Sequence, residues 1–128
     1  MTKKRRHNEK LSEDDALQLV LKSHPEWRRQ WERGTLPDEM LGEDGEPMSP
    51  HMHLQIHVVV ERQLADDEPK GVVAVARELE QLGVSKHEVR HAIGRAVANQ
   101  LWKLMHELRE FDVDEYMAEL REIVKSYQ

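Results

Sequence analysis

Two pairs of histidines, each spaced four residues apart, constrain this chain more than any other feature. They are His53/His57 and His87/His91. Residues at this spacing lie one above the other on the same face of a helix, so each pair directs two imidazoles toward one point. If two such helices pack together, four nitrogens meet at one place. The pattern therefore predicts two helices with a metal ion held between them.

Composition limits what kind of site and fold can be present. The chain has 128 residues, of which 38% are hydrophobic and 34% are charged. This balance indicates small amphipathic helices around a thin core, which a metal or a partner would help to order. There is no cysteine, which excludes disulfides, thiolate nucleophiles and sulfur-ligated metals. Nitrogen and oxygen atoms must hold any metal, which leaves zinc, iron, manganese, nickel and copper open. Of these, zinc or iron is expected.

Charge and hydropathy narrow the range of partners. A net charge of −6 disfavours a broad nucleic-acid surface, and the basic run at residues 3–6 has no interleaved aromatic residues. We expect residues 1–10 to form a disordered basic tail. No apolar run approaches the length of a membrane span, and no signal-peptide core follows the basic start. A cytoplasmic protein without membrane or nucleic-acid partners is expected, and a homo-oligomer is left open.

Capping residues, prolines and glycines divide residues 11–128 into helices. Ser12 is expected to begin the first helix, His24-Pro25 to end it, and Pro25 to begin a short second one. Residues 34–50 are rich in Gly, Pro, Asp and Glu and are expected to form a long loop. Further helices are expected over about 51–64, 70–82 and 85–109, and from residue 112 or 114 onward. We predict an all-α fold, a small bundle of about five helices in a single domain, with the loop before the metal-site helices.

Both histidine pairs fall on apolar helical stripes that should be buried. His53 and His57 share a face with Ile56, Val60 and Leu64. The second stripe comprises His87, His91, Gly94, Ala98, Leu101, Trp102 and Met105. Imidazoles on inward faces are costly unless they are hydrogen-bonded or coordinated. We therefore predict His53, His57, His87 and His91 as ligands of one metal. Glu61, one turn beyond His57, is a further ligand or a hydrogen-bonding neighbour.

The second pair also lies within a peptidase-like motif, His87-Glu88-Val89-Arg90-His91. In a zinc-dependent hydrolase the two histidines would bind zinc and Glu88 would act as general base. The extended form of this motif requires a histidine where this chain has Val97, and no edge strand is expected that would hold an extended substrate. A third hypothesis is a non-catalytic interaction module in which a structural metal joins two helices.

The remaining histidines and several arginines admit ordinary structural roles. His51 is a candidate fifth ligand, but on a helix it faces away from His53 and an exposed first turn explains it as well. His24 and His106 stand alone in the sequence and are expected to pack or cap. Three arginines could form an anion-binding patch, although solvated helix faces account for them equally well: Arg77, Arg90 and Arg95.

Four segments together carry a resemblance to a known family. They are residues 49–57, residues 60–64, residues 87–94 and the earlier His24-Pro25-Glu26-Trp27. In combination they resemble the bacterial domain-of-unknown-function family 1841, over most of the chain beyond the basic tail. The resemblance implies a small helical protein without an assigned activity. It also implies that five residues correspond to the family's motif positions: His53, His57, Glu61, His87 and His91. Some family members carry an acidic residue where this chain has Arg95 or Asn99.

Overall fold

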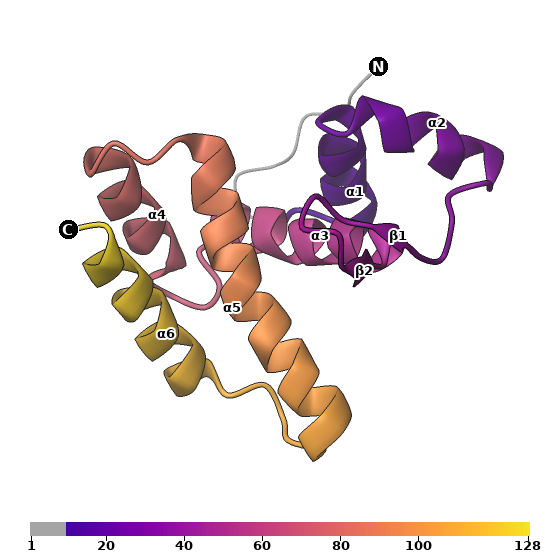
Figure 1. Ribbon diagram of the computed structural model, residues 1–128. Coiled ribbons are helices and arrows are strands. Elements are labelled where there is room, and N and C mark those ends of the chain that lie inside the picture. The colour runs from indigo at the N-terminus through magenta and orange to yellow at the C-terminus, as the bar shows by residue number, and fades with distance from the viewer. Residues whose placement is uncertain (1–9) are drawn as a thin grey trace. The chain divides into compact units, whose positions relative to one another are not determined.

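A computed structural model describes residues 10–128, which form two compact units divided between Arg62 and Gln63. Six α-helices and one two-stranded hairpin lie within the described residues (Figure 1). The all-α prediction is confirmed, and the six helices correspond to the six helical ranges named from the sequence. The basic tail predicted for residues 1–10 lies outside the described part, apart from Lys10. The single domain expected over residues 11–128 stays a prediction.

The first unit begins with a pair of helices set by local capping. Helix α1 spans Glu13–Lys22, and the Ser12 side chain accepts a hydrogen bond from the Asp15 backbone N–H at 3.1 Å, as the sequence predicts. Helix α2 spans Pro25–Arg33 and starts with proline, whose fixed φ suits the first helical position. It ends at Gly34, whose φ of 68° is readily available only to glycine.

The long loop after α2 contains a short hairpin that the sequence prediction missed. Strand β1, Met40–Leu41, pairs antiparallel with strand β2, Pro47–Met48. The turn between them closes through hydrogen bonds from the Gly42 N–H to the Glu46 carbonyl and from the Gly45 N–H to the Gly42 carbonyl. Two residues per strand give no alternating pattern to detect, so the Gly- and Asp-rich composition dominated the prediction.

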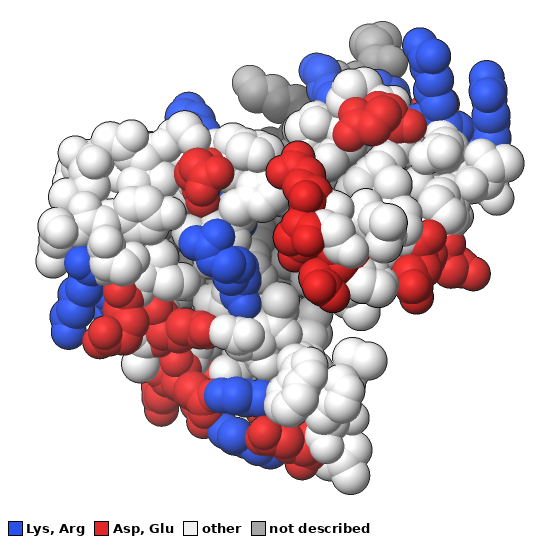
Figure 2. All heavy atoms as spheres, viewed as in Figure 1, with Lys and Arg blue, Asp and Glu red and all other residues white. Residues whose placement is uncertain are grey.

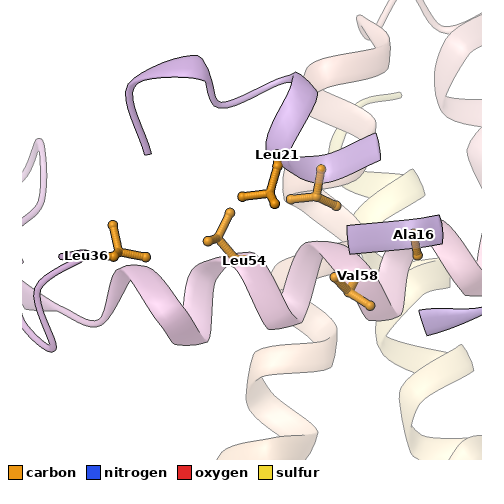
Figure 3. Packing of buried hydrophobic residues seen from close by; sticks show 6 residues of the cluster. Ala16, Leu21, Leu36, Leu54 and Val58 are labelled. Atoms are coloured by element: carbon orange, nitrogen blue, oxygen red, sulfur yellow. The ribbon is translucent and has the colours of Figure 1, made fainter. Parts of the chain in front are cut away.

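Helix α3, Pro50–Asp66, contributes Leu54 and Val58 to the first unit's core. The division between the two units falls near the end of this helix. The core consists of Ala16, Val20, Leu21, Leu36, Leu54 and Val58. Figure 3 shows Leu21 of α1 and Leu54 of α3 pointing toward each other. Leu11, Leu17, Trp27 and Trp31 pack partly buried against this cluster. The unit therefore has the thin core that the composition indicates.

The second unit is built from three helices that pack against one another: α4 (Val72–Gln81), α5 (Lys86–Glu107) and α6 (Val113–Ser126). Its fully buried residues include Leu79, Ile93 and Leu120. The buried Tyr116 hydroxyl donates a 2.5 Å hydrogen bond to the Gln63 side-chain carbonyl. Burial raises the pKa of this phenol well above its usual range. Figure 2 shows acidic and basic side chains interspersed over α5 and α6.

None of the helices in the described part of the chain is long and apolar enough to cross a membrane.

Candidate metal centre

The first histidine pair lies on the core-facing side of α3. The His53 and His57 ring centroids are 4.6 Å apart, as expected for residues one helical turn apart. His57 is buried, with 8% of its surface exposed, and His53 is half-buried. The neighbouring residues Leu54 and Val58 belong to the core, and their burial fixes which side of α3 these imidazoles occupy.

A third histidine, His24, completes a cluster with this pair. One ring nitrogen from each of His24, His53 and His57 lies within 4.8 Å of the other two. The ring centroid of His24 is 5.4 Å from that of His53 and 5.2 Å from that of His57. The cluster therefore joins α3 to the corner between α1 and α2, which is far away in sequence.

His24 occupies the position just before α2, and its ring is held by a backbone contact. Its Nδ1 lies 2.8 Å from the Val20 carbonyl oxygen and 3.1 Å from the Ser23 hydroxyl. Because a carbonyl oxygen only accepts hydrogen bonds, Nδ1 carries the proton in the neutral ring and Nε2 keeps its lone pair. Histidine ligands in metalloproteins are typically oriented in this way, with the other ring nitrogen donating to a carbonyl or carboxylate.

Trp27 forms an aromatic wall beside the cluster. Its ring stacks on His24 with centroids 5.4 Å apart, and it meets His53 edge-on at 5.1 Å. The indole is half-buried against the first unit's core. These contacts restrict the rotation of two of the three imidazoles. Restricted rotation favours metal binding, because less side-chain entropy is lost when the ligands are already positioned.

The chemistry of these residues fits a transition metal. Imidazole nitrogens suit zinc, iron, copper and nickel. Zinc–nitrogen bonds of about 2.0–2.1 Å place tetrahedral ligand atoms roughly 3.4 Å apart. The ligand atoms here lie within 4.8 Å of one another, so they would have to move closer together to bind one zinc ion. Three protein nitrogens leave at least one coordination position for another ligand.

Two further residues of α3 were candidates from the sequence. Glu61 lies one turn beyond His57 and is half-buried, but its carboxylate is not among the ligand atoms that lie within 4.8 Å of one another in the His24, His53 and His57 cluster. His51 has a different environment: its Nε2 lies 3.1 Å from the Leu36 carbonyl oxygen, and its ring lies 5.7 Å from Trp31. His51 is not part of the cluster, and it is half-buried rather than lying in the exposed first turn that was weighed against ligation.

The second histidine pair lies in the other unit, at the start of α5. The His87 and His91 ring centroids are 4.4 Å apart, so this pair also shares one face. The Ser85 side chain accepts a hydrogen bond from the Glu88 backbone N–H at 3.1 Å, which confirms the predicted helix start. The Glu88 side chain is exposed. The common metal site of the two pairs, and the role of Glu88 as a general base, stay predictions.

The stripe predicted to be buried on α5 is wrong in large part. His87, Trp102 and Met105 are exposed, and His91 is half-buried. The helix instead buries a face that includes Val89, Ala92, Ile93, Ala96, Val97 and Gln100. Helix α5 carries two apolar stripes, and packing with α4 and α6 selects the one with branched aliphatic side chains and alanines. Periodicity alone did not distinguish them.

His24 is the site residue that sequence reasoning missed. Its position before Pro25 was interpreted as the end of a helix, which is correct, and a lone histidine at a helix boundary carries no spacing signal. The nearest available signal was the family resemblance, because His24 lies in one of the four segments that carry it. No pattern in the sequence connects residue 24 with residues 53 and 57, because that contact depends on tertiary packing.

A comparison with protein families places these residues in context. The model described as Domain of unknown function (DUF1841) matches residues 1–122. The chain belongs to this family. The DUF1841 match covers His24 and both histidine pairs, so the cluster lies within the family domain. Comparisons with curated proteins and with solved structures found no match.

Proposed function

We propose that this DUF1841 protein binds one divalent metal ion, zinc or iron, through His24, His53 and His57. The observation that carries the proposal is the convergence of three imidazole nitrogens within 4.8 Å from two separate parts of the chain. Two of these ligands, His53 and His57, are those that the sequence predicts. With His24 as the third ligand, no ligand from the second unit is required. All three proposed ligands belong to the first unit.

Metal binding has a clear structural consequence for the first unit. Helix α2 has no fully buried residue, so its position depends on the partial burial of Trp27 and Trp31. A metal bound by His24 and the α3 pair would tie the start of α2 to the core helix. Binding energy available only to the folded unit adds directly to its stability. This favours a structural contribution of the metal, whether or not the open position also serves a reaction.

Glu61 distinguishes the two expected metals. Three imidazoles form a zinc site without any carboxylate, whereas non-haem iron sites typically combine two histidines with one carboxylate. An iron site would therefore need the Glu61 carboxylate as a ligand, and a zinc site would not. Glu61→Gln should leave zinc affinity within about threefold and weaken iron(II) by roughly tenfold or more.

The test begins with elemental analysis of the full chain purified without added metal. The expected result is about one zinc or iron per chain, and loss of that metal in a His53→Ala/His57→Ala double variant. Isothermal titration of the metal-free protein with zinc and with iron(II) then gives the two affinities. Substoichiometric metal with no binding in the titration would contradict the proposal.

His106 offers a matched control for His24. Each ring places Nδ1 near the carbonyl oxygen four residues earlier, at 2.8 Å for His24 and 3.0 Å for His106, and each stacks on a tryptophan. Only His24 belongs to the cluster. His24→Gln should weaken metal binding by about 10- to 100-fold, while His106→Gln should leave it unchanged. Equal effects of the two substitutions would show that the loss comes from local helix contacts.

A further inference from the structure

A small pocket in the second unit combines an apolar floor with a positively charged rim. Its volume is about 210 Å³, and it is lined by Leu64, Val73, Ala76, Arg77, Glu80, Lys86, Val89 and Arg90. Ala76 of α4 and Val89 of α5 are buried and form the floor. Among the described residues, no histidine lines this pocket, and none of the proposed metal ligands belongs to it.

The charges on the lining are unbalanced. The lining comprises three cationic side chains, Arg77, Lys86 and Arg90, and one carboxylate, that of Glu80. Arg77 and Lys86 form no ion pair with any residue in the described range 10–128, whereas four other cations of this unit are paired: Lys103, Arg109, Arg121 and Lys125. An uncompensated positive charge beside an apolar surface favours an anion that also has an apolar part.

The position of Lys86 reinforces this point. Lys86 is the first residue of α5, where the helix macrodipole is positive and acidic residues are normally preferred. Arg90, one turn later, directs Nη1 toward the Lys86 carbonyl oxygen at 3.3 Å, which holds its guanidinium near the same turn. Two cations and the positive end of a helix thus lie together, an arrangement that a bound anion would stabilise.

The pocket contains part of the arginine patch whose role the sequence left open. Two of its three arginines, Arg77 and Arg90, line one cavity together with Lys86. Arg95 is exposed on α5 outside that lining. The volume is below the usual range of about 300–1,000 Å³ for drug-sized ligands, so it fits a molecule with one ring or a short branched chain.

We infer that this pocket binds a small organic carboxylate whose apolar body lies on Ala76 and Val89 and whose charge lies between Arg77, Lys86 and Arg90. Charge-assisted hydrogen bonds fix the carboxylate, and the apolar floor selects against purely inorganic anions. The Glu80 carboxylate repels the carboxylate of the ligand, and this repulsion lowers the affinity for anions.

The test is an NMR titration of the full chain with three probes: benzoate, benzyl alcohol and inorganic phosphate. Benzoate has both the ring and the charge, whereas each of the others has one. The expected result is saturable benzoate shifts at the backbone amides of Val73, Lys86 and Val89. Benzoate should bind at least about tenfold more tightly than either partial probe. Phosphate binding as tightly as benzoate, or shifts located elsewhere, would overturn the inference.

Substitutions then test the role of each charge. Arg77→Met and Lys86→Met keep an apolar stem and should each weaken benzoate binding by about tenfold. Arg95 lies on α5, as Lys86 does, but outside the pocket. Arg95→Met therefore removes one positive charge without changing the lining and should change the benzoate affinity by less than about twofold. Glu80→Gln should strengthen binding, by about two- to threefold. An equal loss in Arg77→Met and Arg95→Met, or weaker binding in Glu80→Gln, would contradict the inference.

Discussion

The two histidine pairs are almost identical locally and differ in their surroundings. Their ring centroids are 4.6 Å and 4.4 Å apart, with interplanar angles of 50° and 51°. His53 and His57 lie beside core residues and meet His24 from another helix. His87 is exposed in the first turn of α5. Sequence spacing thus places two imidazole ligands together, whereas tertiary packing brings the third imidazole ligand and partly buries the site.

The largest expected difference between the pairs is in metal affinity. His57→Ala should weaken zinc binding by roughly 100-fold or more, because it removes a buried ligand from a set of three. His91→Ala should change it by less than about threefold. Isothermal titration of both variants measures the contrast. A similarly large loss in His91→Ala would instead support the four-histidine site predicted from the sequence.

Metal removal should affect the two units unequally. At a free metal concentration of about 1,000 times the dissociation constant, binding adds about 4 kcal/mol to the stability of the structure that binds it. Chelation should therefore lower hydrogen-exchange protection in α1 and the first half of α3, with a smaller change in α4 and α6. Equal loss of protection in both units would contradict a site confined to the first unit.

Tyr116→Phe tests the second unit without touching the first. The substitution removes a hydroxyl that donates to the buried Gln63 side chain, so it should lower the free energy of unfolding by about 1–3 kcal/mol. Chemical denaturation measures this change. Metal affinity should stay the same, and a weaker metal site in this variant would show that the two regions are coupled.

The same phenol predicts a dependence on alkaline pH. Burial raises the pKa of Tyr116 in the folded protein above the unfolded value of about 10. The stability linked to this neutral phenol is therefore fully present below about pH 10 and is lost as the pH rises toward the folded pKa. Denaturation above pH 10 should show a fall in stability that is smaller in Tyr116→Phe.

The smallest expected effect concerns the start of the second pair's helix. Ser85→Ala removes the N-cap that accepts from the Glu88 N–H and should cost about 1 kcal/mol of stability. Metal content should not change. Loss of metal in this variant, measured by elemental analysis, would give the His87-Glu88 turn a larger role than the present account assigns to it.

Much of the fold follows from local signals. Ser12, Ser85 and Asp112 cap helices at predicted positions, and Pro25 and Pro50 begin two more, because these residues act through their own backbone neighbours. The hairpin at residues 40–48 was missed because its strands are too short to show a period.

The candidate site was only half predictable. The His53/His57 pair could be placed on one helix face from spacing alone. His24 could not be assigned to the same site, because its ring reaches that pair only after α1 packs on α3 through Leu21 and Leu54. The burial of α5 was mispredicted for a related reason, since the choice between two apolar stripes depends on the neighbouring helices.

X-ray absorption spectroscopy at the metal edge tests the three-histidine site most directly, in the natively purified protein and in its His24→Gln variant. We expect three imidazole nitrogens at about 2.0–2.1 Å in the natural chain and two in the variant. An unchanged imidazole count in His24→Gln, or four imidazoles that fall to two in a His87→Ala/His91→Ala variant, would contradict the three-histidine site.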